Sequence, residues 1–161
     1  MNRLLQALDR LAARLARIHP PWWVWPAGLL LAGIFALSAS LLLHPGPDEF
    51  VYFPNGQRFG DTCAFIVVTG SPCPQCGMTR SWVYAARGQL WTSFLYNPAG
   101  LALFGWIMVG ALIGAVRLIR RDPEALRPPW QLNVAWAVFW LIGLYAGPWI
   151  LRLLGINPLP L

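Results

Sequence analysis

The sequence has few charged residues and no lysine. Of its 161 residues, 11% are charged and 57% are hydrophobic. About a quarter of the residues in a soluble domain are charged, so this composition excludes an ordinary soluble domain. It also excludes a disordered chain, because low hydrophobicity is the signature of disorder. All 12 basic residues are arginine, and they cluster near the ends of apolar stretches. This distribution indicates membrane topology and argues against nucleic-acid binding.

Residues that commonly carry catalysis are also scarce. The chain has two histidines, six acidic residues and three cysteines. It contains no G-x-S-x-G, H-E-x-x-H or P-loop motif. The sequence therefore favours a protein that is not an enzyme, and it offers no catalytic or cofactor-binding residue to assign.

The 18 charged side chains leave four charge-free stretches, at residues 18–47, 62–79, 88–116 and 128–151. A helix that crosses the hydrocarbon core needs about 20 mostly apolar residues. Three of the four stretches are long enough, whereas 62–79 is interrupted by glycine, proline and cysteine. We therefore expect a small membrane protein with three spans, and residues 62–79 to form a short surface or re-entrant element.

The predicted transmembrane helices cover about residues 22–43, 98–118 and 132–153 within one membrane domain, 20–161. Tryptophans open the first span and suit a water–lipid interface. Asn97 followed by Pro98 is typical of a helix start, because asparagine caps free N–H groups and proline fits the first helical position. The fold class expected is an all-α membrane protein.

Residues 1–19 are predicted to form an amphipathic helix in the headgroup layer. Five apolar residues recur there at steps of four and three, and four arginines occupy other faces. Such a helix places arginine beside anionic lipid and leucine in the acyl boundary. The apolar residues are Leu4, Leu8, Leu11, Leu15 and Ile18.

Residues 44–97 form the predicted extracytoplasmic segment between the first two spans. Its first part, 44–61, is polar, rich in turn formers and without helical periodicity. Its last part, 79–96, has an apolar side and two arginines, Arg80 and Arg87, seven residues apart on one face. We expect 79–96 to be a short helix at the membrane surface.

The arginines also predict the orientation of the chain. With three spans, the N-terminal segment and the loop 117–127 lie on the same side and carry eight arginines, against four on the other side. The positive-inside rule then favours a cytoplasmic N-terminus and an extracytoplasmic C-terminus.

All three cysteines, Cys63, Cys73 and Cys76, lie in the predicted extracytoplasmic segment, and three cysteine-based interpretations compete. Two of them form a structural disulfide. Alternatively, Cys73 and Cys76 exchange disulfides, with a thiolate favoured by a helix start and by Arg80 on the same helix face. In the third interpretation, the three cysteines bind Zn²⁺ or Cu⁺, with His44 as a candidate fourth ligand.

A fourth interpretation assigns no chemistry to the cysteines. Gly77, Thr79 and Arg80 at a helix start hold an anionic lipid headgroup or a carboxylate of a partner, and Arg87 is a further candidate on the same face. From these alternatives we expect a non-enzymatic binding or accessory protein. Its expected partners are membrane lipids and a membrane protein or a second copy of the chain, without nucleic acid. The alternative is a thiol–disulfide oxidoreductase or metal-binding protein.

The stretch Cys73-Pro74-Gln75-Cys76-Gly77-Met78-Thr79-Arg80 resembles a family of small bacterial membrane proteins of unknown function with the motif C-P-x-C-G-x-T-R. The resemblance takes in Cys63, Thr69-Gly70, Arg87-Gly88 and Asn97-Pro98, and it covers roughly residues 60–118. Gln89 departs from the pattern, where an aspartate is expected. The resemblance implies a bacterial inner-membrane location and locates the site, but it implies no reaction.

Overall fold

The three predicted spans are present as helices. The computed structural model describes residues 21–46, 50–60, 64–70 and 73–154. Three helical stretches among these residues are long and apolar enough to cross a membrane: Val24–Leu42 (α2), Pro98–Arg120 (α6) and Trp130–Ile150. The chain is therefore an all-α membrane protein. The predicted interfacial helix at 1–19 lies outside the described residues.

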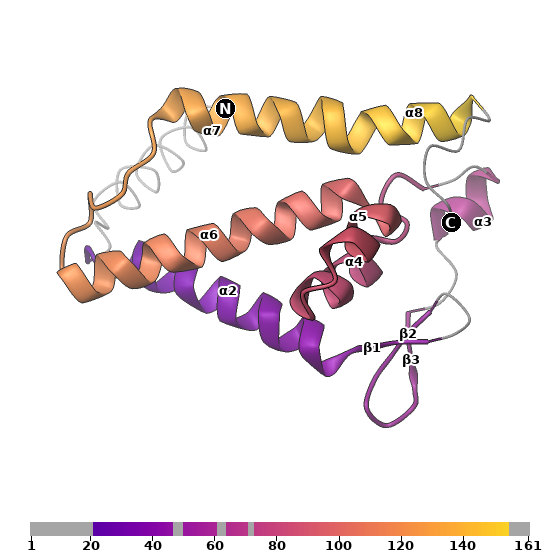
Figure 1. The fold of residues 1–161 in the computed structure, drawn as a ribbon, viewed down its shortest axis with the longest axis horizontal. Helices are drawn as coiled ribbons and strands as arrows, with labels where there is room; N and C mark the ends of the chain where they lie inside the picture. The colour runs from indigo at the N-terminus through magenta and orange to yellow at the C-terminus, as the bar shows by residue number, and fades with distance from the viewer. Residues whose placement is uncertain (1–20, 47–49, 61–63, 71–72, 155–161) are drawn as a thin grey trace, which may run out of the picture.

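Helices α2 and α6 lie side by side and run in opposite directions (Figure 1). Small residues allow this close approach. A Cβ added to Gly114 would lie 2.5 Å from the carbonyl oxygen of Pro26, and one added to Gly33 would collide with Ala111. The start of α2 therefore meets the end of α6, which places residue 21 and the loop after Arg120 at the same end of the pair. Gly105, in the same helix, has open space around it.

The third span is a continuous helical segment made of α7 (Trp130–Val138), η1 (Phe139–Ala146) and α8 (Gly147–Leu153). The η1 segment is a π-helix. This span contacts α6 mainly through η1, where the indole N–H of Trp140 donates to the carbonyl oxygen of Ala99 at 2.8 Å. In Figure 1 it crosses the molecule above α6, and the two diverge towards the loop that joins them.

The prediction of one helix over 79–96 is wrong in detail, because the structure has two. Met78–Ala86 (α4) and Leu90–Tyr96 (α5) are separated by a turn at Gly88, whose φ is +76°. Both helices pack against each other and against α6, and α4 also contacts α2. The apolar side of the sequence continues across the turn, so periodicity alone did not reveal it.

The predicted irregular segment 44–61 contains a small antiparallel sheet. Its strands are β1 (His44–Pro45), β2 (Val51–Tyr52) and β3 (Arg58–Phe59), in the order β1-β2-β3. Val51 pairs with Phe59, and His44 pairs with Tyr52. Strands of two residues are too short to show an alternating pattern in a sequence.

Between this sheet and the Cys73–Cys76 motif lies a short helix, α3 (Ala64–Thr69), whose described side chains are exposed. Six helical residues extend about 9 Å, which is far too short to cross a bilayer. The apolar core sits where α4 meets the end of α2 and the sheet: Val83, Leu43 and Val51 form a buried cluster there. The cysteine motif begins beside this core.

Candidate functional site

The two cysteines of the motif lie in a turn that precedes α4. The N–H of Cys76 donates to the carbonyl oxygen of Cys73 at 3.2 Å, and α4 begins only at Met78. Cys73 is buried, and its sulfur accepts the N–H of Gln75 at 3.4 Å. The sequence interpretation that put the cysteines on the helix face of Arg80 is therefore wrong. A cysteine sulfur does contact a backbone N–H, because that of Cys73 accepts the N–H of Gln75.

Asn97 fixes this turn to the start of α6. Its side-chain nitrogen donates to the carbonyl oxygen of Cys76 at 3.1 Å, and more weakly to that of Pro74 at 3.5 Å. Its side-chain oxygen accepts the N–H of Gly100 at 2.8 Å, which confirms the predicted helix cap. Asn97 is only 4% exposed, and its bond to Gly100 is buried, whereas the bonds to Cys76 and Pro74 are partly buried. One amide thus joins two elements that are more than 20 residues apart in sequence.

Gly77 is required by the backbone where the turn enters α4. Its φ is +81°, a conformation that side chains rarely adopt, and a Cβ there would lie 2.8 Å from the carbonyl oxygen of Tyr96. Both restrictions favour glycine. The structure therefore gives this predicted site residue a role in shaping the turn.

Two serines that sequence reasoning missed complete the corner between α4, α5 and α6. Ser81 and Ser93 are fully buried, and their hydroxyl oxygens lie 2.8 Å apart. The Ser93 hydroxyl donates to the carbonyl oxygen of Ser81, and the Ser81 hydroxyl donates to that of Asn97. The sequence feature that could have revealed them is the presence of small polar residues on the apolar side of 79–96. Their size permits the helices to approach, and the carbonyl oxygens of Ser81 and Asn97 accept the two hydroxyl hydrogens.

Arg87 caps the end of α2. Its guanidinium donates to the carbonyl oxygens of Ser40 at 3.1 Å, Leu41 at 3.2 Å and Leu43 at 2.6 Å. It also donates to Val83 in the preceding turn of its own helix. The last carbonyls of a helix have no partner within the helix, so this arginine satisfies groups that would otherwise need water. Arg87 thus joins α4 to α2, and its contacts indicate a structural role.

Arg80 is buried, with 5% of its surface exposed. Its guanidinium lies over the ring of Tyr96, 4.8 Å from the centroid, and makes a long hydrogen bond of 3.4 Å to the carbonyl oxygen of Phe50. Its Nε has no partner among the described residues. The described acids, Asp122 and Glu124, follow the opposite end of α6. The charge of Arg80 is therefore not balanced by a carboxylate within the described part of the chain.

The ring of Tyr96 also stacks on Tyr84, with centroids 5.2 Å apart and planes within 2°. Burial, together with the neighbouring Tyr96, raises the pKa of Tyr84 above its ordinary value. The positive charges of Arg80 and Arg87 act in the opposite direction but do not cancel the effect. The arginines and tyrosines thus form one electrostatic cluster on α4 and α5.

A cavity of about 340 Å³ lies between the end of α2 and the first turns of α4. Gln75 and Thr79 of the motif line it and are exposed. Trp82 also lines it, and its indole N–H is buried without a partner among the described residues. The cavity is completed by Ala39, Ser40, Leu43, Phe59, Met78 and Val83.

The three-cysteine metal site stays a prediction, because Cys63 lies outside the described residues. Within residues 21–46, 50–60, 64–70 and 73–154, no three His, Cys, Asp or Glu side chains lie together as metal ligands would. His44, the candidate fourth ligand, is exposed on β1.

Comparison with known proteins finds a family model that matches one segment of the chain. No curated protein and no solved structure matches the chain. The matched segment contains α3, the cysteine turn, α4, α5 and the first part of α6, which agrees with the resemblance seen in the sequence. Residues 63–111 match the family described as a protein of unknown function, DUF2752.

Proposed function

We propose that this chain is a non-enzymatic binding or accessory protein, whose C-P-x-C-G-x-T-R element docks a partner at the membrane surface. One observation carries the proposal: two N–H donors on the first half of α4, Arg80 Nε and Trp82 Nε1, are buried and have no acceptor among the residues that the structure describes. A buried donor that lacks an acceptor costs about 1–3 kcal/mol. A bound group that offers carboxylate or carbonyl oxygens would remove that cost.

The rest of the element supplies a rigid support for such a group. The bonds of Asn97, Ser81 and Ser93 hold the turn and both short helices to the start of α6. The exposed side chains of Gln75 and Thr79 then face a cavity whose walls are already in place. A preformed site loses little conformational freedom on binding, which favours recognition. The partner that fits is a membrane protein, or a second copy of this chain, with an oxygen-bearing segment at the bilayer surface.

The proposed location is the bacterial inner membrane, with the N-terminus in the cytoplasm and the element outside. The support is the count of eight arginines against four, together with the antiparallel pairing of α2 and α6. A reporter fused to the C-terminus should be active outside the cytoplasm. A cytoplasmic C-terminus would contradict this orientation.

Site-specific photocrosslinking in cells tests the docking proposal. A photoreactive amino acid at Gln75 or Thr79 should yield a discrete adduct, whereas the same probe at Gln57, an exposed position in the β2–β3 turn, should not. The adduct at position 75 should weaken in Arg80→Gln. Absence of an adduct at both cavity positions, or the same adduct at position 57, would refute a partner at this element.

Thiol–disulfide exchange is the second candidate, favoured by the N–H of Gln75 that points to the Cys73 sulfur at 3.4 Å. Hydrogen bonding to sulfur stabilises a thiolate. Cys76→Ser should abolish exchange with a model disulfide completely if this is the function, and should only lower stability if the element docks a partner. For the metal-binding alternative, a thiol count on the non-reduced protein is decisive, because a count of one would exclude a three-thiolate site.

A further inference from the structure

A large groove lies between α6 and α7, far from the cysteine element. Its volume is about 900 Å³, in the upper part of the range of about 300–1,000 Å³ that is usual for ligand pockets. One wall comes from α6 and Leu29 of α2, and the other from the loop and the first turns of α7. We name this cavity the α6–α7 groove.

The groove exists because the third span touches α6 at only part of its length. Trp140 binds Ala99 near the start of α6, and the rings of Trp106 and Trp136 stack 5.4 Å apart further along. Beyond this stack, Pro128 and Pro129 delay the start of α7 to Trp130, and the helix stands away from the end of α6 (Figure 1). The groove therefore opens between two membrane spans.

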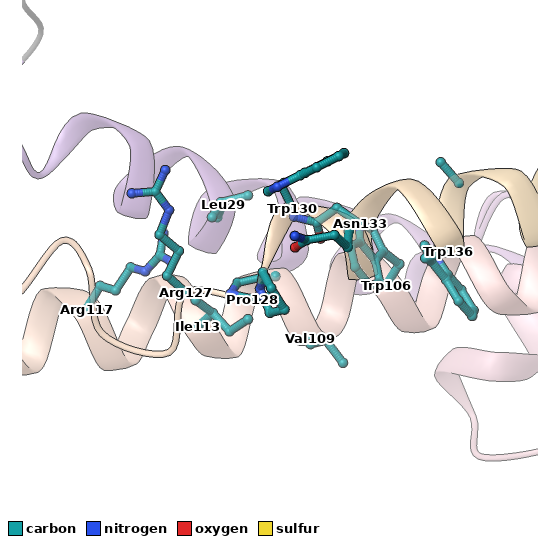
Figure 2. Close-up of a pocket in the computed structure, with 14 residues that line it drawn as sticks. Leu29, Trp106, Val109, Ile113, Arg117, Arg127, Pro128, Trp130, Asn133 and Trp136 are labelled. Atoms are coloured by element: carbon teal, nitrogen blue, oxygen red, sulfur yellow. The ribbon is translucent and has the colours of Figure 1, made fainter.

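The lining changes from apolar to cationic along the groove. Leu29, Val109 and Ile113 provide aliphatic surface. The indoles of Trp106 and Trp136 lie towards one end, and that of Trp130 lies nearer the middle (Figure 2). Figure 2 shows the side chains of Arg117 and Arg127 at the opposite end.

Both arginines have N–H donors left to offer. Arg117 uses its Nε to bind the carbonyl oxygen of Ala125 at 2.9 Å, and Arg127 forms an exposed ion pair with Glu124 at 2.6 Å. A guanidinium has five N–H donors, and its fork matches two oxygens of a phosphate. Arg117 lies in the last turn of α6, so its depth is that of the headgroups. A 23-residue helix extends about 35 Å and the hydrocarbon core is about 30 Å thick.

From this arrangement we propose that the α6–α7 groove binds one anionic phospholipid of the bilayer, with its phosphate on Arg117 and Arg127 and an acyl chain along Leu29, Val109 and Ile113. Charge complementarity identifies the occupant, because only an amphiphile with an anionic head matches both parts of the lining. A second copy in the same orientation would bring its own arginines to the same depth, where like charges repel. The lipid would hold the third span against α6.

Native mass spectrometry of the purified full-length protein tests this proposal with phosphatidylglycerol and phosphatidylcholine of the same chain length. We expect one phosphatidylglycerol bound with an affinity about tenfold higher than phosphatidylcholine. The double variant Arg117→Gln/Arg127→Gln should lose this preference. Arg120→Gln/Arg121→Gln removes the same charge from exposed positions that do not line the groove, and should keep it.

A second pair of variants protects the test against misfolding. Val109→Trp fills the groove and should abolish retention of the lipid. Leu112→Trp adds the same ring to the same helix at a position that is 68% exposed and outside the groove, and should not. Equal binding of both lipids, equal effects within either pair of variants, or a lipid-free dimer as the bound species would overturn the proposal.

Discussion

Two regions of this molecule, the polar corner around Asn97 and the third span, are held in place by different interactions. Where α4 and α5 join the end of α2 and the start of α6, buried polar atoms bind each other across elements, as Asn97, Ser81 and Ser93 do. No residue of α7 or η1, which form most of the third span, is buried inside the protein. One indole hydrogen bond and one pair of stacked rings are its most specific contacts with α6.

The difference follows from what a bilayer can solvate. Lipid chains cover an apolar helix as well as another helix does, so a span can face lipid at little cost. Irregular backbone has no such option, since its N–H and C=O groups need partners near the membrane. Polar side chains are therefore concentrated where the chain turns. The segment that matches the family model, 63–111, includes α4, α5 and the start of α6, where these polar side chains lie, and none of the third span.

The largest expected effect is at Asn97. Replacing it by alanine removes the cap of α6 and leaves the partly buried carbonyl oxygens of Cys76 and Pro74 with one donor fewer. We expect a loss of about 4 kcal/mol in the free energy of unfolding. Thermal unfolding of the detergent-solubilised protein measures it. Asn55→Ala, at an exposed turn, is the control and should have little effect.

A smaller loss is expected for Gly77→Ala, and Gly88→Ala is its matched control. Both glycines have positive φ, but only Gly77 lacks space for a Cβ, because the carbonyl of Tyr96 is 2.8 Å away. We expect a loss of about 3 kcal/mol at Gly77 and about 1 kcal/mol at Gly88. Equal unfolding temperatures for the two variants would show that close packing does not hold the cysteine turn.

Trp140→Phe tests the weakly packed side of the comparison. It removes the hydrogen bond to Ala99 but keeps an aromatic ring, so a loss of about 1 kcal/mol is expected. Trp25→Phe changes an indole that is 73% exposed, and should leave the unfolding temperature nearly unchanged. If Trp140→Phe were as destabilising as Asn97→Ala, the proposed contrast between the polar corner around Asn97 and the weakly packed third span would be wrong.

The smallest effect concerns pH. Because the pKa of Tyr84 is raised in the folded protein, its unfolded form loses the phenolic proton first as the pH rises through 10. The contribution of the protonated Tyr84 to the free energy of unfolding is therefore complete below pH 10, and it declines as the pH rises towards the pKa of Tyr84 in the folded protein. In Tyr84→Phe, the decrease in unfolding temperature between pH 9 and pH 11 should be shallower. A variant that follows the wild-type curve would exclude this contribution.

Much of the fold could be predicted from local patterns. Charge-free stretches located three spans to within a few residues, and Asn97-Pro98 marked the start of α6. The turn at Gly88 and the small sheet were missed, because one interrupts an otherwise continuous apolar side and the other has strands of two residues. Both features depend on contacts with distant segments and leave little trace in local periodicity.

The sequence singled out the segment that holds the candidate site residues, but it did not show which distant groups those residues contact. Arg87 was expected to face a ligand, and it binds carbonyl groups at the end of α2 that lie more than 40 residues earlier. The cysteines were expected on the helix and lie before it. The contacts of a side chain such as Arg87 depend on which distant backbone groups lack partners. A linear sequence motif does not contain that information.

The sequence by itself determined that the chain enters a membrane, how many spans it forms and where the unusual segment lies, because scarcity of charge and turn-forming residues act locally. Only the tertiary structure decided which polar groups have partners within the described part of the protein and which do not. Internal hydrogen bonds use the side chains of Asn97, Ser81 and Arg87. In contrast, Arg80 Nε and Trp82 Nε1 lack acceptors among the described residues. That distinction depends on burial and distance between elements, which arise when the helices pack.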